Sequence, residues 1–201
     1  MEERKMGKGI IKFVLGLVVI VGIIVFAIAG NGINAPTEFK SQYNCDVNLI
    51  SLKVDVDITG TNKYNITGEI MSAYEDDLMM KNKNGDTVKI ADDSYNFISQ
   101  NNHVIMNDDK VEYVCDGKIK WLADSYDIYD ADSNKIAYVK FNIFDTVGIM
   151  VDNDGNEIAR YDSGYFRYDY VVSIFDNCEI DDESVLMIFA SYFSDKRADA
   201  E

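Results

Sequence analysis

The fold is decided by the stretch VLMIFASYF, which occupies Val185–Phe193 near the carboxyl end of the chain. It follows Asp181–Ser184, a good N-terminal cap that puts acidic residues at the positive end of a helix dipole. The predicted helix is apolar almost all round, which indicates burial on every side. Its apolar part is about nine residues long, too short to span a bilayer. A flat sheet would cover only one face, so we expect a sheet curled around the helix.

Strands are predicted upstream of this helix from a period-two alternation of apolar and polar residues. The alternation begins after Asn48 and is interrupted at Gly60–Asn62, whose composition is typical of a turn. Its apolar members are Ile50, Leu52, Val54, Val56, Ile58, Tyr64, Ile66 and Ile70. This pattern predicts half-buried strands on both sides of the turn.

A hairpin-like unit then repeats. Tyr126–Ala137 and Gly148–Ala159 are two copies, and Leu78–Val88 is a weaker third. The matching pairs in the two clear copies are Ile128/Met150, Asp130/Asp152, Asp132/Asp154, Asn134/Asn156, Ile136/Ile158 and Ala137/Ala159. Asp, Asn and Gly supply the positive φ angles that tight hairpin turns require. Short strands at this spacing, with no βαβ alternation, predict a mainly β antiparallel sandwich or barrel.

The order of these segments resembles the LURP-one-related family, part of the tubby C-terminal-like group that also includes phospholipid scramblases. The resemblance covers roughly Tyr64 to Lys196, and its carriers are Asp130–Ala137, Asp152–Ala159, Tyr168–Ile174 and Asp182–Asp195. It implies a closed antiparallel β-barrel that encloses a hydrophobic C-terminal helix. It also implies a non-catalytic role, because members of this group are mostly non-catalytic.

Tubby-like domains bind phosphoinositides through basic residues, and the chain departs from that pattern. Its nearest candidates, Lys81, Lys83 and Lys89, are scattered among Asp and Asn. An N-terminal anchor also departs from the intracellular setting of plant and animal members. The resemblance therefore carries over the fold and not the phosphoinositide site.

The N-terminal region reads as a membrane anchor. The uncharged stretch Phe13–Ala29 would span roughly 26 Å as a helix, close to the ~30 Å hydrocarbon core. Arg4, Lys5, Lys8 and Lys12 precede it, and the next basic residue is Lys40. The positive-inside rule places the N-terminus in the cytoplasm and the rest outside. A cleaved signal peptide is the alternative, with Ala27–Ala29 as the small-residue pattern before Gly30.

The sequence thus divides into a cytoplasmic N-terminus (1–12), a transmembrane anchor (13–30), a linker (31–46) and a tubby-like β-barrel domain (47–201). We expect a single-pass protein of the cell membrane with its C-terminal domain extracytoplasmic. Beyond residue 12 the chain has 15 basic and 33 acidic residues, a net charge near −18. Such a field repels nucleic acid and anionic lipid head groups and favours cations or basic partners, although a solubilising surface also explains it.

No catalytic, cofactor-binding or metal-ligating residue is predicted. Cys45, Cys115 and Cys178 are widely spaced, which argues against a zinc site. His103 is the only histidine, and we interpret it as an ordinary residue at the start of a strand. Asp152–Asn156 lacks the glycine at position six and the glutamate at position twelve of an EF-hand, so it reads as a hairpin turn. Weak surface calcium binding by adjacent carboxylates stays open.

Acidic pairs and aromatic residues have ordinary structural explanations. Neighbouring carboxylates on a strand face opposite ways, so solvated turns and a helix cap account for the pairs better than acid–base chemistry does. The pairs are Asp76–Asp77, Asp92–Asp93, Asp108–Asp109 and Asp181–Asp182. The aromatic residues that we assign to barrel packing, rather than to a sugar-binding platform, are Trp121, Tyr126, Tyr129, Tyr138, Tyr165, Tyr168 and Tyr170.

The expected function is that of a membrane-anchored, non-enzymatic binding or structural domain. The alternative is a lipid-interacting, scramblase-like protein, and a hydrolase that uses acidic residues is a third hypothesis. The ligand, the partner, the oligomeric state, the disulfide status and the fate of the N-terminal segment are left open by the sequence.

Overall fold

The computed structural model describes residues 38–48, 53–69, 78–93, 102–118, 125–142, 146–163 and 169–198. Twelve antiparallel strands form one closed barrel, in which each strand pairs with its neighbours in the chain and β1 pairs with β12. The strands are β1 (Phe39–Val47), β2 (Lys53–Gly60), β3 (Lys63–Glu69), β4 (Leu78–Asn82), β5 (Thr87–Asp93), β6 (Asn102–Asn107), β7 (Lys110–Lys118), β8 (Ser125–Asp130), β9 (Lys135–Phe141), β10 (Val147–Asp152), β11 (Glu157–Ser163) and β12 (Tyr170–Phe175). The predicted mainly β fold and closed antiparallel barrel are confirmed.

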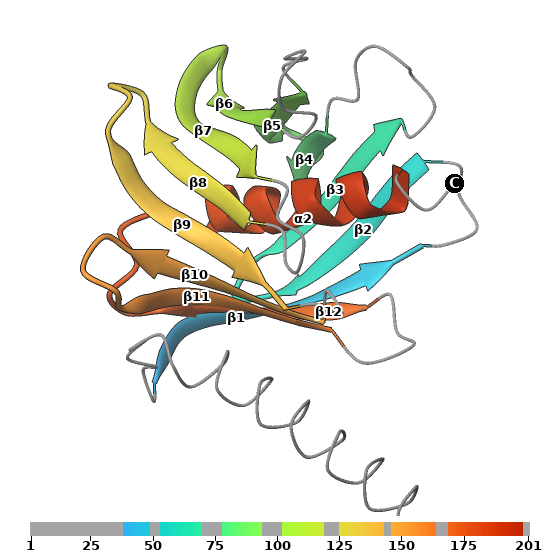
Figure 1. Ribbon diagram of the computed structural model, residues 1–201. Coiled ribbons are helices and arrows are strands. Elements are labelled where there is room, and N and C mark those ends of the chain that lie inside the picture. The colour runs from blue at the N-terminus through green and yellow to red at the C-terminus, as the bar shows by residue number, and fades with distance from the viewer. Residues whose placement is uncertain are drawn as a thin grey trace, which may run out of the picture. The chain divides into compact units, whose positions relative to one another are not determined.

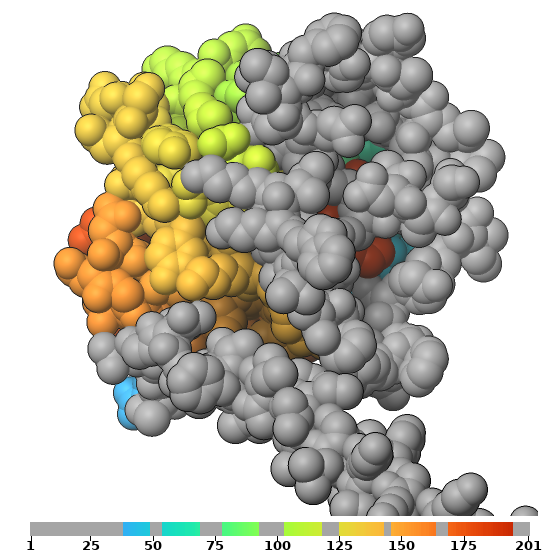
Figure 2. Space-filling model, viewed as in Figure 1, coloured from blue at the N-terminus to red at the C-terminus, as the bar shows by residue number. Residues whose placement is uncertain are grey.

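The barrel is wrapped around one helix, α2 (Asp182–Ala198), as Figure 1 shows. The side chains from Ser184 to Tyr192 are at most 2% exposed. Leu186 and Phe189 lie on one side of the helix and Ile188 lies on the other, and all three are enclosed. In the space-filling view, side chains of β8 to β11 form a continuous surface on one side of the molecule (Figure 2). The prediction from the all-round apolar helix is therefore confirmed.

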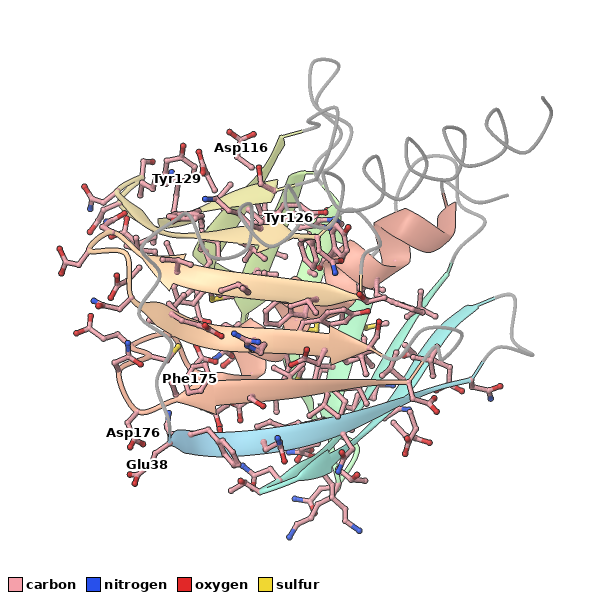
Figure 3. All side chains as sticks on the ribbon, turned by 60° about the horizontal axis from the view of Figure 1, so that its bottom comes forward. Glu38, Asp116, Tyr126, Tyr129, Phe175 and Asp176 are labelled. Atoms are coloured by element: carbon pink, nitrogen blue, oxygen red, sulfur yellow. The ribbon has the colours of Figure 1, made fainter. Side chains whose placement is uncertain are left out.

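The strands of the barrel end at two rims, and the tight hairpin turns share one of them. We call this end the turn rim; its turns are 61–62, 83–86, 108–109, 131–134 and 153–156. The chain enters β1 and leaves β12 at this same rim, where Phe39 pairs with Phe175. Glu38, Phe175 and Asp176 lie together there (Figure 3). Helix α2 begins six residues after Asp176, so the helix enters the barrel from the turn rim.

Four consecutive hairpins carry the same irregularity near the turn rim. In each, the cross-strand register shifts by one residue, which leaves one extra residue in the second strand. The extra residues are Val88, Glu112, Ile136 and Ile158. Val88, Ile136 and Ile158 pack against the core. Because a β-bulge increases the local twist, the repeated bulges help the sheet to close around the helix.

Aromatic rings pack the helix against β9 and β10. The ring of Phe141 stacks on Tyr192 with an interplanar angle of 7° and meets Phe189 edge-on. Gly148 lies beside this cluster, and a Cβ atom there would stand 2.6 Å from the Phe141 ring. Glycine at this position therefore lets β10 approach the packed rings.

The barrel begins earlier than the predicted boundary at residue 47. Strand β1 occupies Phe39–Val47, most of it within the stretch interpreted as a linker (31–46). The physical reason is the same alternation seen elsewhere, because Tyr43, Cys45 and Val47 face the core while their neighbours face solvent. The predicted anchor (13–30) lies outside the described residues. Among the residues that are described, no helix has the length and apolar character needed to cross a membrane.

Candidate functional site

Three consecutive carboxylates at the start of α2 form the centre of a polar cluster at the turn rim. Asp181, Asp182 and Glu183 receive hydrogen bonds or ion pairs from side chains of β1, β3 and β5. Acidic residues at this position also interact favourably with the helix dipole. We call this set, with its partners, the helix-start cluster; the partners are Lys40, Ser41, Tyr43, Tyr64, Lys89 and Glu112.

Asp182 joins the helix to β1 through three donors. Its carboxylate accepts hydrogen bonds from Lys40 Nζ at 3.0 Å, Ser41 Oγ at 2.6 Å and the Tyr43 hydroxyl at 2.9 Å. Burial alone would raise the pKa of Asp182, but the hydrogen bonds from Ser41 and Lys40 outweigh it and hold that pKa below its ordinary value. Asp182 is therefore held as a carboxylate in the folded protein.

Glu183 makes the equivalent connection to β3. It accepts a hydrogen bond from the hydroxyl of Tyr64, whose ring lies 6.4 Å from that of Tyr43. Burial, followed by the hydrogen bond to the neighbouring carboxylate, raises the pKa of each tyrosine. Both hydroxyls are thus held in the protonated form that donates to the helix.

Lys89 of β5 lies between two carboxylates. Its ammonium contacts Glu112 of β7 and lies 3.1 Å from Asp181, and its side chain is only 6% exposed. Burial would lower the pKa of Lys89, but the hydrogen bond to Glu112 and the charge of Asp181 reverse this effect and raise it. A buried ammonium with two acidic partners is charge-compensated, as a buried charge must be.

The Lys89–Glu112 pair breaks the hairpin repeat. Glu112 is the extra bulge residue of its hairpin, the place that Ile136 and Ile158 occupy in two other hairpins. Lys89 follows the bulge residue Val88, as Ala137 and Ala159 follow theirs. Lys89 and Glu112 therefore replace apolar residues at equivalent positions of the hairpins. Lys89 contacts both Glu112 and Asp181, which precedes the helix.

The protonation states of the cluster suit binding and stabilisation better than proton transfer. A general acid or base works best when its pKa lies near the operating pH. In the cluster the pKa of Lys89 is raised, that of Asp182 is lowered, and those of the two tyrosines are raised. Each shift moves the group away from neutral pH. The cluster therefore works as a set of fixed charges and donors.

His103, Cys45 and Cys115 lie in strands of the barrel, and Cys178 lies between β12 and α2. His103 is the second residue of β6, buried, with its ring 6.4 Å from that of Tyr126. Cys45, Cys115 and Cys178 are buried thiols. Burial raises the pKa of Cys45 to about 12 and that of Cys178 to about 11, which makes these two thiols poor nucleophiles.

The Asp-rich repeats form hairpin turns. Asp152 accepts hydrogen bonds from the backbone N–H groups of Asp154 at 2.9 Å and Asn156 at 2.8 Å. Asp130 is hydrogen-bonded in the same way at the β8–β9 turn, and Asn82 at the β4–β5 turn. Hydrogen bonds from Asn134 lower the pKa of Asp130. The carboxylates are thus engaged by the backbone of their own turns.

Of the acidic pairs, Asp108–Asp109 forms the β6–β7 turn and Asp181–Asp182 begins the helix, as predicted, while Asp92–Asp93 ends β5. Asp76–Asp77 lies outside the described residues. Within the described ranges no group of three or more His, Cys, Asp or Glu side chains is arranged to hold a metal ion. The predicted surface calcium binding stays a prediction.

The aromatic residues divide between the inside and the outside of the barrel. Tyr126 and Tyr170 are buried, whereas Tyr129 and Tyr138 are partly exposed. Tyr126 and Tyr129, both in β8, are labelled in Figure 3. Lys135 and Lys140 lie over the ring of Tyr138, 5.4 and 4.9 Å from its centroid. Trp121, Tyr165 and Tyr168 lie outside the described residues.

Sequence reasoning placed Asp181–Glu183 at a helix cap but did not find their partners. The sequence shows Lys89 as one of three scattered basic residues, and no local pattern predicts its pairing with Glu112. A signal was present, since these two residues interrupt the apolar pattern of the hairpin repeat. Comparisons with protein families, curated proteins and solved structures gave no match.

Proposed function

We propose that this chain is a membrane-anchored, non-enzymatic binding or structural module whose barrel lies outside the cytoplasm. The observation that carries the proposal is the filled interior of the barrel. Side chains of α2 from Ser184 to Tyr192 occupy the space in which other barrels hold a ligand. A partner must therefore be engaged on the outer wall or at a rim.

The chemistry of the helix-start cluster supports the same proposal. Its shifted pKa values fix charges instead of preparing a proton donor or acceptor near neutral pH. The negative charge of the chain favours a cationic or basic partner over nucleic acid or an anionic lipid surface. Residues 13–30 would provide the anchor, and the chain enters the barrel at the turn rim.

The anchor and the topology are tested on the full chain with a C-terminal epitope tag. We expect the protein to stay in the membrane pellet after alkaline carbonate extraction, and we expect protease added to intact cells to remove the tag. Mass spectrometry should find an N-terminus upstream of Phe13. A tag protected from protease contradicts the topology, and an N-terminus at Gly30 replaces the anchor with a cleaved signal peptide.

Liposome flotation distinguishes the proposed binding module from the lipid-interacting alternative. The sample is the barrel fragment, residues 38–201, and circular dichroism first shows that the fragment is folded. Liposomes of anionic and of zwitterionic lipid are compared, each with and without calcium. We expect no flotation in any of the four conditions, because the charge of the barrel repels anionic surfaces. Flotation that requires calcium and anionic lipid would favour the scramblase-like alternative.

A further inference from the structure

The ladder between β5 and β6 stops short of the turn rim. Its last cross-strand pair toward that rim is Ile90 with Met106, although β5 starts at Thr87 and β6 continues to Asn107. The two strands remain paired on their other sides, to β4 and β7. A depression of about 190 Å³ lies at this interruption. We call it the rim notch; the lining residues used below are Val88, Lys89, Ile90, Met106, Asp108 and Asp109.

The rim notch combines apolar and polar surface with two acidic residues at its edge. Val88, Ile90 and Met106 line it with apolar surface, and Asp108 and Asp109 are exposed at the turn beside it. Both aspartates have positive φ angles, 49° and 61°, as a tight two-residue hairpin turn requires. The turn therefore places both acidic residues beside the notch.

Lys89 also lines the notch, and its positive charge is compensated by two carboxylates. Its ammonium contacts Glu112 and Asp181. The charge presented to solvent at the notch is therefore negative. A ligand that complements this arrangement has an apolar stem and a cationic head, as arginine and lysine side chains do.

The size of the notch also limits the ligand. Pockets that enclose small organic molecules are usually about 300–1,000 Å³, larger than this depression. The notch fits one side chain better than a whole small molecule. Next to the notch, the β5–β6 register ends at Ile90 and Met106, so Thr87, Val88 and Lys89 lie beyond the last pair of that ladder.

We propose that the rim notch binds one arginine or lysine side chain from an extended basic segment of a partner protein. The stem packs on Val88, Ile90 and Met106, and the cationic head meets the carboxylates of Asp108 and Asp109. This inference rests on the proposed function, since it names the chemistry of the partner and the place where the binding module engages it.

The test uses the full chain in detergent and a short fluorescent peptide of alternating arginine and threonine; a matched glutamate–threonine peptide is the negative control. Fluorescence anisotropy measures affinity for the parent protein and for Asp108→Asn/Asp109→Asn. The charge control is Asp132→Asn/Asp154→Asn, which removes two exposed carboxylates from other hairpin turns. Asparagine tolerates positive φ, so the β6–β7 turn is preserved.

A second pair of variants tests shape without changing charge. Thr87→Trp places a bulky ring at the mouth of the notch, and Thr59→Trp puts the same ring at an exposed strand position away from it. We expect Asp108→Asn/Asp109→Asn and Thr87→Trp each to weaken binding about fivefold or more, with both controls within about twofold of the parent.

Three results overturn the inference: no binding of the basic peptide, equal weakening by the two double-asparagine variants, or unchanged binding by Thr87→Trp. Equal weakening by the two double variants would show attraction to the general negative charge of the barrel. None of these results alters the protease and extraction experiments, so failure of the notch and failure of the proposed function can be told apart.

Discussion

The hydroxyl of Tyr43 donates a hydrogen bond of 2.9 Å to Asp182, which joins the first strand of the barrel to the helix at its centre. The two residues are 139 positions apart in the sequence. Lys40 and Ser41 donate to the same carboxylate. This single side chain thus connects β1, where the chain enters the barrel, to the start of α2, and it is the natural place to test how the helix is held.

Asp182→Ala should destabilise the barrel by about 3 kcal/mol, because it leaves the buried donors of Ser41 and Tyr43 without an acceptor. Denaturant unfolding followed by circular dichroism measures the loss. Asp176→Ala, an exposed position in the preceding turn, is the control and should change stability by less than about 0.5 kcal/mol. Equal effects of the two substitutions would contradict a specific role for Asp182.

Lys89→Met should lower the free energy of unfolding by about 3 kcal/mol or more, because it leaves Glu112 and Asp181 without their buried counter-ion. The double variant Lys89→Met/Glu112→Ile should recover much of this loss. It restores the apolar character that the equivalent positions have in the β8–β9 and β10–β11 hairpins. The same unfolding measurement applies; a double variant no more stable than the single one would show that the unpaired carboxylate of Glu112 is not the cause of the loss.

Gly148→Ala should destabilise the folded barrel by about 1–3 kcal/mol, because the added methyl group overpacks the core. A Cβ atom there would stand 2.6 Å from the Phe141 ring, and that ring is stacked against Tyr192 and cannot easily move away. Differential scanning calorimetry should give a lower Tm for the variant. Gly148→Ala/Phe141→Leu tests the cause, since a smaller side chain should relieve part of the clash; no relief would mean that the strain arises elsewhere.

Ser133→Gly should stabilise the protein slightly, and Gly155→Ser should destabilise it, each by about 0.5–1 kcal/mol. The two residues hold the same place in matching hairpin turns, with φ angles of 65° and 88°. An L-residue with a side chain is disfavoured in this left-handed region. Thermal unfolding of both variants checks the opposite signs, and shifts in the same direction would refute the equivalence of the turns.

Stability should fall at alkaline pH. Burial raises the pKa of Tyr43 and Tyr64 above the ordinary tyrosine value of 10.0. As the pH rises, Tyr43 and Tyr64 therefore ionise first in the unfolded chain. The stability that their protonated hydroxyls contribute is fully present below about pH 10, and it is lost as the pH rises through the pKa values of the folded protein. Lys89, whose pKa is raised above 10.5, acts in the same direction.

Unfolding free energies measured across the alkaline range, together with tyrosinate absorbance, provide the check. Tyr43→Phe/Tyr64→Phe removes two of the titrating groups and should give a shallower decline than the parent. An equally steep decline in the variant would assign the alkaline sensitivity to other residues.

How far the sequence could predict this protein depends on the distance over which each interaction acts. The strand alternation, the turn chemistry of Asp130 and Asp152, and the cap before α2 are local, so they were readable from neighbouring residues. The barrel followed from one further step, since a helix without a polar face must be surrounded. The early start of β1 differs from the prediction because the Gly, Asn, Ser and Pro residues of 30–43 are typical of a linker, while the alternation of β1 rests on few apolar side chains.

The sequence alone determined the hairpin repeats, the helix and the need to enclose it, because hydrophobic periodicity and turn propensity are properties of short segments. Only the tertiary structure decided which strands supply Lys40, Tyr43, Tyr64 and Lys89 to the three carboxylates at the start of α2. Those contacts join residues far apart in the chain, and closure of the barrel between β1 and β12 brings them together. No local pattern encodes that closure, since it depends on the register and twist of all twelve strands.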